Sequence, residues 1–314
     1  MSITPGYKSK RRFMQLALRR PEDSVGEDYI SNGATPLAMQ TKGLGVEPWI
    51  TEQVTRDLDD GKNGAQPVIH TGEMIKISGA FEMAGSGTAN TPVAFAAMLQ
   101  MAGMDQVTQA DKVVHSRILN AASETDGTIY FWWEGMYHIL LAGKASLSIA
   151  AKVGEIGYIN FEAQGVYGGT LSGSIPQGDF SAFTLPEEFS KQNTSFSLDG
   201  QALNCTSFEM AQNNSIELDE GTEVKQIFID DWDEEVKVTV ETPELATFDP
   251  FAIARSNTFV PLEFTQGITA GRIFKVASTA AQIITITPGE HKGKATWELT
   301  MKAIRGNDCV LTTQ

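Results

Sequence analysis

The sequence is poor in the residues that most often carry chemistry. Its 314 residues include only two cysteines, Cys205 and Cys309, which form no CxxC pair. That spacing argues against both a disulfide framework and a zinc site. The four histidines are scattered, at positions 70, 115, 138 and 291, and none belongs to an HExxH pattern. The sequence therefore predicts neither an enzyme nor a protein with a metal or other cofactor.

Long apolar runs and an excess of positive charge are lacking too. The longest apolar stretch, residues 130–142, is interrupted by Glu134, Gly135 and His138, and it is shorter than the roughly 20 residues of a membrane-spanning helix. No membrane segment is expected. The formal net charge is -15, which predicts either simple solubility or a surface that repels nucleic acid. Free cysteines indicate synthesis in the cytoplasm.

The most informative feature of the sequence is that two distant segments carry similar residues in the same order. Residues 154–166 begin with Gly-Glu and continue to an aromatic-Glu pair, Phe161-Glu162, and residues 289–301 do the same with Trp297-Glu298. A repeat of about 140 residues is too long for a solenoid and indicates a duplicated domain. Two copies of one domain in a chain can occupy equivalent places in a symmetric assembly.

Elements are expected in the same order in both halves. Alternating polar and apolar residues at 73–79 and 236–241 are typical of half-buried strands. Each is followed by a helix with a capping residue and a proline at its start, at 91–103 and 249–255. Further strands, a Gly-Glu turn and a closing strand complete each half. We expect a mainly β fold of two tandem β-sandwich or half-barrel domains, each with a flanking helix.

Composition places the boundaries of these parts. Residues 1–35 lack periodicity and are expected to form an extended arm, and residues 171–194 are rich in Gly, Ser and Pro and are expected to link two domains at 36–170 and 195–314. The basic run of the arm is either a solvated tail or a contact with an acidic neighbouring subunit; its members are Lys8, Lys10, Arg11 and Arg12.

Two further groups of residues stand out. The acidic stretch at 230–235 is either a solvated turn or a set of hard oxygen ligands, although it lacks the spacing of an EF-hand. The apolar helix is expected to pack against a sheet, through Phe95, Met98, Leu99 and Met101.

Taken in order, these segments resemble a known family. The stretch at 72–77, the glycine-rich turn, the helix leading to Met104, and the Gly-Glu turn before residues 161–167 are similar to those of tail tube (major tail) proteins of tailed bacteriophages. The resemblance runs from about Phe13 to Arg305. The family helix often ends in Cys-Gly, whereas this one ends in Ala102-Gly103.

The resemblance implies a non-enzymatic virion protein without cofactors. Such proteins form stacked rings, assembled in the host cytoplasm, in which neighbouring hairpins close a central β-barrel around passing DNA. Their implied partners are further copies and the tail terminator, tape measure and distal tail proteins. Two domains per chain imply a homotrimeric, pseudo-hexameric ring, and the basic run at residues 8–12 is the candidate for a contact with an adjacent ring. Candidate lumen or hairpin residues, whose other interpretation is ordinary outward-facing strand positions, are Glu47, Glu52, Asp57, Glu209, Glu217 and Asp219.

Two alternatives remain. An inner-tube protein of a contractile injection or type VI-like system would keep the fold and change the cargo. A carbohydrate-active β-sandwich tail protein would require a cleft with paired carboxylates.

Overall fold

The computed structural model describes residues 10–56, 58–59 and 64–314, and it confirms a mainly β protein, with 54% strand and 5% helix. The elements of the N-terminal half are β1 (Arg12–Leu18), β2 (Leu37–Met39), β3 (Lys42–Thr55), β4 (Val68–Glu82), α1 (Ala96–Met101), β5 (Met104–Thr108), β6 (Val113–Arg117), a 3-10 turn (Ala121–Ser123), β7 (Gly127–Trp133), β8 (Met136–Lys152) and β9 (Tyr158–Ser172).

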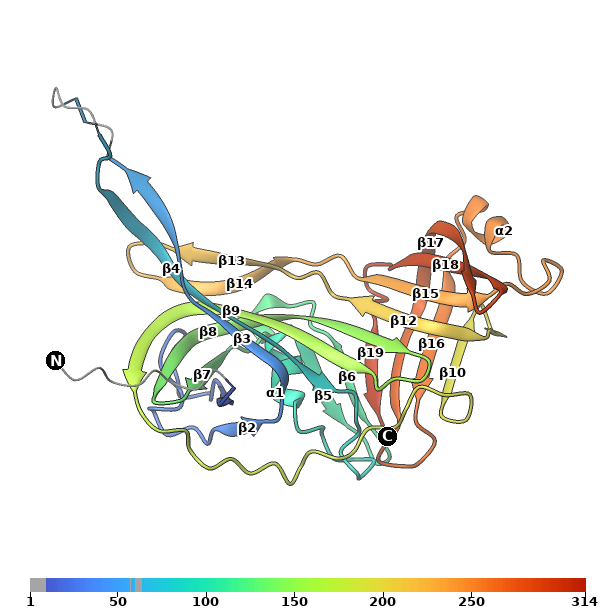
Figure 1. Ribbon diagram of the computed structural model, residues 1–314, viewed down its shortest axis with the longest axis horizontal. Helices are drawn as coiled ribbons and strands as arrows, with labels where there is room; N and C mark the ends of the chain where they lie inside the picture. The colour runs from blue at the N-terminus through green and yellow to red at the C-terminus, as the bar shows by residue number, and fades with distance from the viewer. Residues whose placement is uncertain (1–9, 57, 60–63) are drawn as a thin grey trace.

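The C-terminal half begins after the long irregular segment that follows β9. Its elements are β10 (Thr194–Leu198), β11 (Gln201–Ala202), β12 (Cys205–Ala211), β13 (Ser215–Glu220), β14 (Lys225–Asp231), β15 (Glu235–Glu241), α2 (Pro250–Arg255), β16 (Val260–Gln266), β17 (Phe274–His291), β18 (Lys294–Ala303) and β19 (Val310–Thr313). Figure 1 shows the N-terminal half in blue and green and the C-terminal half in yellow to red.

The two halves repeat one order of antiparallel strand pairing. In the N-terminal half it is β1-β7-β8-β9-β4-β3, and in the C-terminal half it is β10-β16-β17-β18-β15-β12. Even an irregularity recurs. The register of the β7–β8 pairing shifts next to the pair Gly127–Gly143, and the register of the β16–β17 pairing shifts in the same way next to the pair Val260–Ala281. Because bulges are specific local features, this agreement makes the elements of the two halves counterparts of one another.

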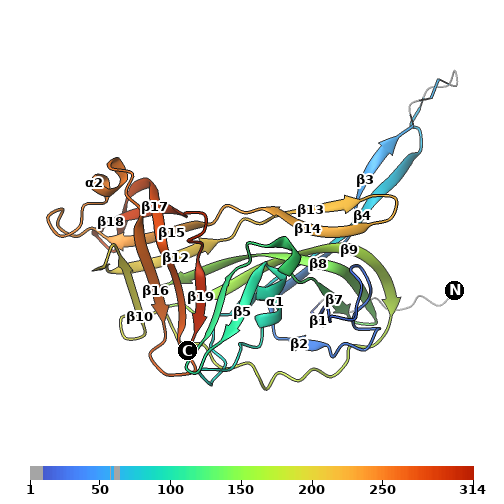
Figure 2. The same cartoon turned by 180° about the vertical axis from the view of Figure 1, so that it is seen from behind.

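The halves are joined edge to edge. β12 pairs with the end of β8, from Ser207 opposite Lys152 to Ala211 opposite Ser148, and β19 pairs with β6. The first junction produces a continuous run of eight strands, β3-β4-β9-β8-β12-β15-β18-β17. Seen from behind, this run extends from β3 across the molecule to β17 (Figure 2).

The helices cover matching places in the core. Phe95, Met98, Leu99 and Met101 are all buried. Phe161 of β9 stacks on Phe81, which stacks in turn on Phe95 beside α1. In the C-terminal half Trp297 lies edge-on to Phe251 in the first turn of α2, with ring centroids 5.6 Å apart.

The start of the first helix was predicted wrongly. α1 begins at Ala96, not at Thr91, because the Thr91 amide closes a turn to Thr88 and Phe95 occupies the N-cap without a side-chain cap. α2 begins as expected, since the Asp249 carboxylate accepts hydrogen bonds from the amides of Phe251 and Ala252. Tertiary packing of Phe95 thus replaces local capping in one half only.

Two other expectations need correction. Residues 12–18 are not a free arm, because β1 pairs with β7 along its whole length and fully buries Met14 and Leu16. Gly289-Glu290 is not a turn, since both residues lie in β17. The chain reverses at Lys292-Gly293, with φ of 51° and 80°, which suits a two-residue hairpin loop.

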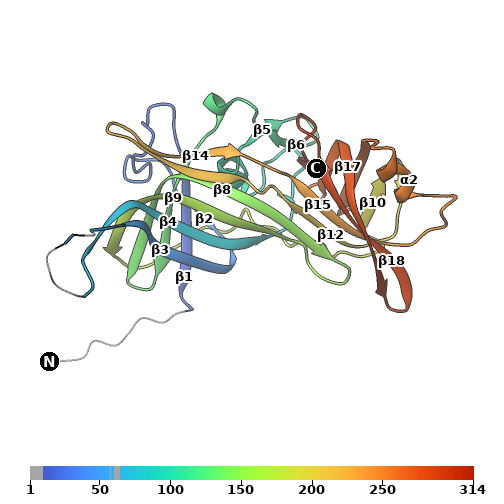
Figure 3. The same cartoon turned by 90° about the horizontal axis from the view of Figure 1, so that it is seen from above.

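Two hairpins leave the sheet. β3 and β4 continue beyond the body as an exposed hairpin, which projects away from the other strands in Figure 1. Its counterpart is the two-stranded sheet of β13 and β14, inserted between β12 and β15. That hairpin instead lies along β8, as the view from above shows (Figure 3).

Candidate functional site

The eight-stranded sheet has one apolar and one polar face. In β4, Ile75 and Ile77 are fully buried, whereas Lys76 and Ser78 point the other way because side chains alternate along a strand. Neighbouring strands follow the same alternation. The polar face is built from Lys76, Ser78, Ser146, Ser148, Asn160, Glu162, Ser207, Glu209, Lys237, Thr239, Glu298 and Thr300.

Each half places one lysine between carboxylates on this face. Glu47 lies opposite Lys76, and the Lys76 ammonium is 2.6 Å from the Glu162 carboxylate. In the C-terminal half Glu209 lies opposite Lys237. Glu298 lies diagonally across from Lys237 on the neighbouring strand, as Glu162 lies diagonally across from Lys76 in the first half. Acids outnumber lysines in both rows, so each row is negative overall.

The charges of the second row act on each other. The pKa of Lys237 is raised, first by the hydrogen bond from its ammonium to Glu235 and also by the carboxylates of Glu209 and Glu298. The Lys237 side chain is nearly half exposed, so solvent screens these interactions. The rows therefore set the charge of the surface more than they stabilise the fold.

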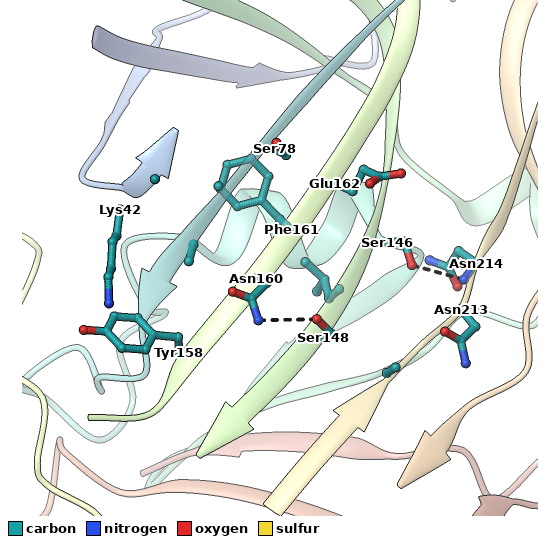
Figure 4. Close-up of a pocket in the computed structure, with 15 residues that line it drawn as sticks. Lys42, Ser78, Ser146, Ser148, Tyr158, Asn160, Phe161, Glu162, Asn213 and Asn214 are labelled. Carbon is teal, nitrogen blue, oxygen red and sulfur yellow. Dashed lines mark hydrogen bonds between the residues drawn. The ribbon is translucent and has the colours of Figure 1, made fainter. Parts of the chain in front are cut away.

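A groove of about 730 Å³ lies on the polar face where β12 leaves β8. Figure 4 shows Ser78, Ser148 and Asn160 along its floor and Asn213 and Asn214 at its side. Its polar groups bind one another, since the Asn214 amide donates to Ser146 and Asn160 donates to Ser148. The groove is lined mainly by hydroxyls and amides, with Lys42 and Glu162 as its charged groups, and no histidine or cysteine is among its lining residues.

No family model and no curated protein matches this sequence. No helix within the described residues is long and apolar enough to span a bilayer. In the same part of the chain, no three His, Cys, Asp or Glu side chains are placed to share a metal ion. The acidic stretch at 230–235 thus shows no metal-ligand geometry.

The structure separates the candidate acidic residues. Glu47 and Glu209 occupy equivalent positions on the polar face. Glu52 is in the projecting β3–β4 hairpin, and Glu217 and Asp219 are exposed on β13. Asp57 lies outside the described residues. Whether any of these carboxylates lines a lumen stays a prediction.

The basic residues near the N-terminus have partners within the chain. Arg11 forms an ion pair with Glu134, 2.6 Å between the charged atoms. The Arg12 guanidinium lies over the Trp133 ring and donates to the Leu44 carbonyl. Lys10 is exposed, and Lys8 lies outside the described residues. A contact of this run with an adjacent ring stays a prediction.

A buried polar cluster, which was not predicted from the sequence, joins the halves where β6 meets β19. Arg117 of β6 lies 4.1 Å over the Trp232 ring, and Trp232 donates a hydrogen bond of 2.8 Å to Asp308. Glu234 accepts from the Cys309 amide at 2.6 Å, while its second oxygen is buried without a partner. In the sequence, Arg117 and the acidic stretch at 230–235 are far apart, and neither has a pattern that predicts their contact.

Burial shifts the pKa of several groups near this junction. Loss of solvent raises the pKa of Glu234 to about 7, with Arg117 opposing and Asp308 reinforcing that shift. Desolvation lowers the pKa of His115, which is fully buried in β6, to about 4. Glu234 therefore titrates near neutral pH, inside the contact between the halves.

Proposed function

We propose that this chain is a structural virion protein that forms the tail tube of a tailed bacteriophage, a hollow conduit of stacked rings through which DNA passes. The proposal is supported by a mainly β fold whose order of strand pairing occurs twice in the chain. One observation carries it: the way in which the two halves pair within the chain, edge strand to edge strand, can be repeated between one copy and the next.

The pairing within the chain is the junction of β12 with β8. β3 is the counterpart of β12, yet its outer edge has no strand partner in the described part of the chain. β17 is the counterpart of β8, and its residues 282–291 pair with β18 alone among the described strands. We infer that β3 of one copy meets β17 of the next, as β12 meets β8 within the chain. Pairing would also remove two open sheet edges that otherwise favour aggregation.

Such a contact is head-to-tail, and head-to-tail contacts close into rings when the rotation allows it. Three copies of the eight-stranded run give 3 × 8 = 24 strands, and the two matching halves give pseudo-sixfold symmetry. The polar face, which lies away from the helices and the core, then faces the lumen. Three chains carry 3 × (-15) = -45 formal charges, and an acidic wall does not hold the phosphates of passing DNA.

Electron microscopy and native mass spectrometry of the purified protein test this proposal. We expect rings with a central hole, stacking into tubes at higher protein concentration, and a ring mass of three chains. Monomers at every concentration would overturn the proposal. Rings of six chains would keep the tube and overturn the trimer.

A further inference from the structure

The β13–β14 hairpin has an apolar face that packs against the N-terminal half. Two cross-strand pairs form it, Ile216 with Ile229 and Leu218 with Ile227. Ile227 and Ile229 are only 3% and 7% exposed. The opposite face of the hairpin is exposed and carries Glu217.

The seat of this hairpin is the fork where β7 and β8 diverge. A cavity of about 320 Å³ at the fork is lined by Asp126, which precedes β7, by Lys144 of β8, and by residues 226–229 of β14. Asn214 fixes the base of the hairpin by donating to the carbonyls of Ala102 and Ala145.

The projecting β3–β4 hairpin is the counterpart of this hairpin, but the described part of its own chain leaves its outer half exposed. Val54 and Ile69 lie directly opposite each other on its two strands. These side chains are 52% and 53% exposed. A cross-strand pair of β-branched residues is the kind of surface that the β13–β14 hairpin buries.

The counterpart of the seat lies in the C-terminal half. Since Gly127 and Val260 hold the same place in the repeated bulge, Phe259 corresponds to Asp126. Lys144 corresponds to the segment 282–285, which contains Ile284. Where the first seat presents the charged side chains of Asp126 and Lys144 among others, the second presents Phe259 and Ile284 at the matching positions, which are 52% and 50% exposed.

We propose that the β3–β4 hairpin of one copy seats on the β16–β17 fork of a second copy, with Val54 and Ile69 against Phe259 and Ile284. This inference rests on the proposed function, because ring closure brings the two surfaces together. In this contact, each of the two exposed apolar patches is covered by the other patch from a neighbouring copy. The hairpin then braces each interface in the same way that β13–β14 braces the junction within the chain.

Charge substitutions test the contact. Ile69→Glu and Phe259→Lys should each raise the protein concentration for half-maximal ring formation roughly tenfold or more, because each places a charge in an apolar contact. The double variant should recover most of that loss, since the new charges meet across the interface. The matched control is Leu185→Glu, which charges another exposed apolar residue, 78% exposed in the segment between the halves. Sedimentation velocity measures assembly, and thermal unfolding of the unassembled chain checks the fold.

The outcomes separate the two proposals. If the unmodified protein forms rings and Ile69→Glu shifts assembly no more than Leu185→Glu, the hairpin seat is overturned and the tube stands. If the double variant assembles no better than the weaker single variant, the two residues do not meet and the seat is likewise overturned. If the unmodified protein forms no rings, the tube itself is overturned.

A cross-link gives a second readout that does not depend on weakened assembly. Ile69→Cys combined with Phe259→Cys should form a disulfide between chains in the rings under mild oxidation. The native cysteines, Cys205 and Cys309, are buried and compete little. Dimers and trimers on a denaturing gel, reversed by reductant, support the seat, whereas rings that yield only monomers contradict it.

Discussion

Replacing Phe161 with alanine should lower the free energy of unfolding by about 3–5 kcal/mol, the usual cost of removing a buried phenylalanine. Phe161 is 3% exposed, and its ring stacks on Phe81 with centroids 4.8 Å apart. The substitution leaves a cavity between the sheet and α1. Urea denaturation followed by intrinsic fluorescence measures the loss.

The next residue supplies the matched control. Glu162 lies on the polar face, and its ion pair with Lys76 is partly exposed. Glu162→Gln should therefore change the free energy of unfolding by less than about 1 kcal/mol. Equal losses for the two substitutions would show that the aromatic-Glu pair has a different role from the one its burial indicates.

Between pH 5 and pH 8, Glu234→Gln should gain stability relative to the unmodified protein by about 2.5 kcal/mol. The pKa of Glu234 is about 7 in the folded protein, against 4.5 for an ordinary glutamate. Between these values the folded state binds more protons than the unfolded state, so stability falls as pH rises. Glutamine keeps an acceptor for the Cys309 amide and does not ionise, which removes this loss.

The pH dependence of stability must be compared between the variant and the unmodified protein, because His115 changes stability with pH in the opposite direction. Its pKa is lowered to about 4 from 6.5, so its contribution to stability rises with pH over that interval. Arg117, Asp231, Asp308 and Cys309 also face this junction and are present in both proteins. Urea denaturation at four pH values measures both profiles. Parallel profiles would mean that Glu234 ionises normally in the folded chain.

Patterns within one strand were predicted well. Period-two alternation placed β4 and β15 correctly, because a half-buried strand must alternate wherever it lies. The start of α2 was predicted equally well, since an aspartate cap and a proline act through contacts within three residues. For α1 the same reasoning failed, because the stacking of Phe95 on Phe81 overrides the local cap.

Short strands without a distinctive pattern were missed. No strand was predicted at β5, β6 or β19, yet β19 pairs with β6 across almost 200 residues. The cluster of Arg117, Trp232 and Glu234 was missed for the same reason. Its members are ordinary in their own segments and become a site only because that pairing brings them together.

The sequence by itself determined a mainly β chain with a repeated order of elements, a negative charge and few chemically reactive side chains. Those properties follow from composition and from periodicity along a strand. Only the tertiary structure decided that the repeat extends to the same bulge in both halves and that β12 continues the sheet of the first half. It also decided that β3 and residues 282–291 of β17 each keep one edge without a partner among the described strands. Strand partners are chosen by packing between distant segments, which no local pattern records.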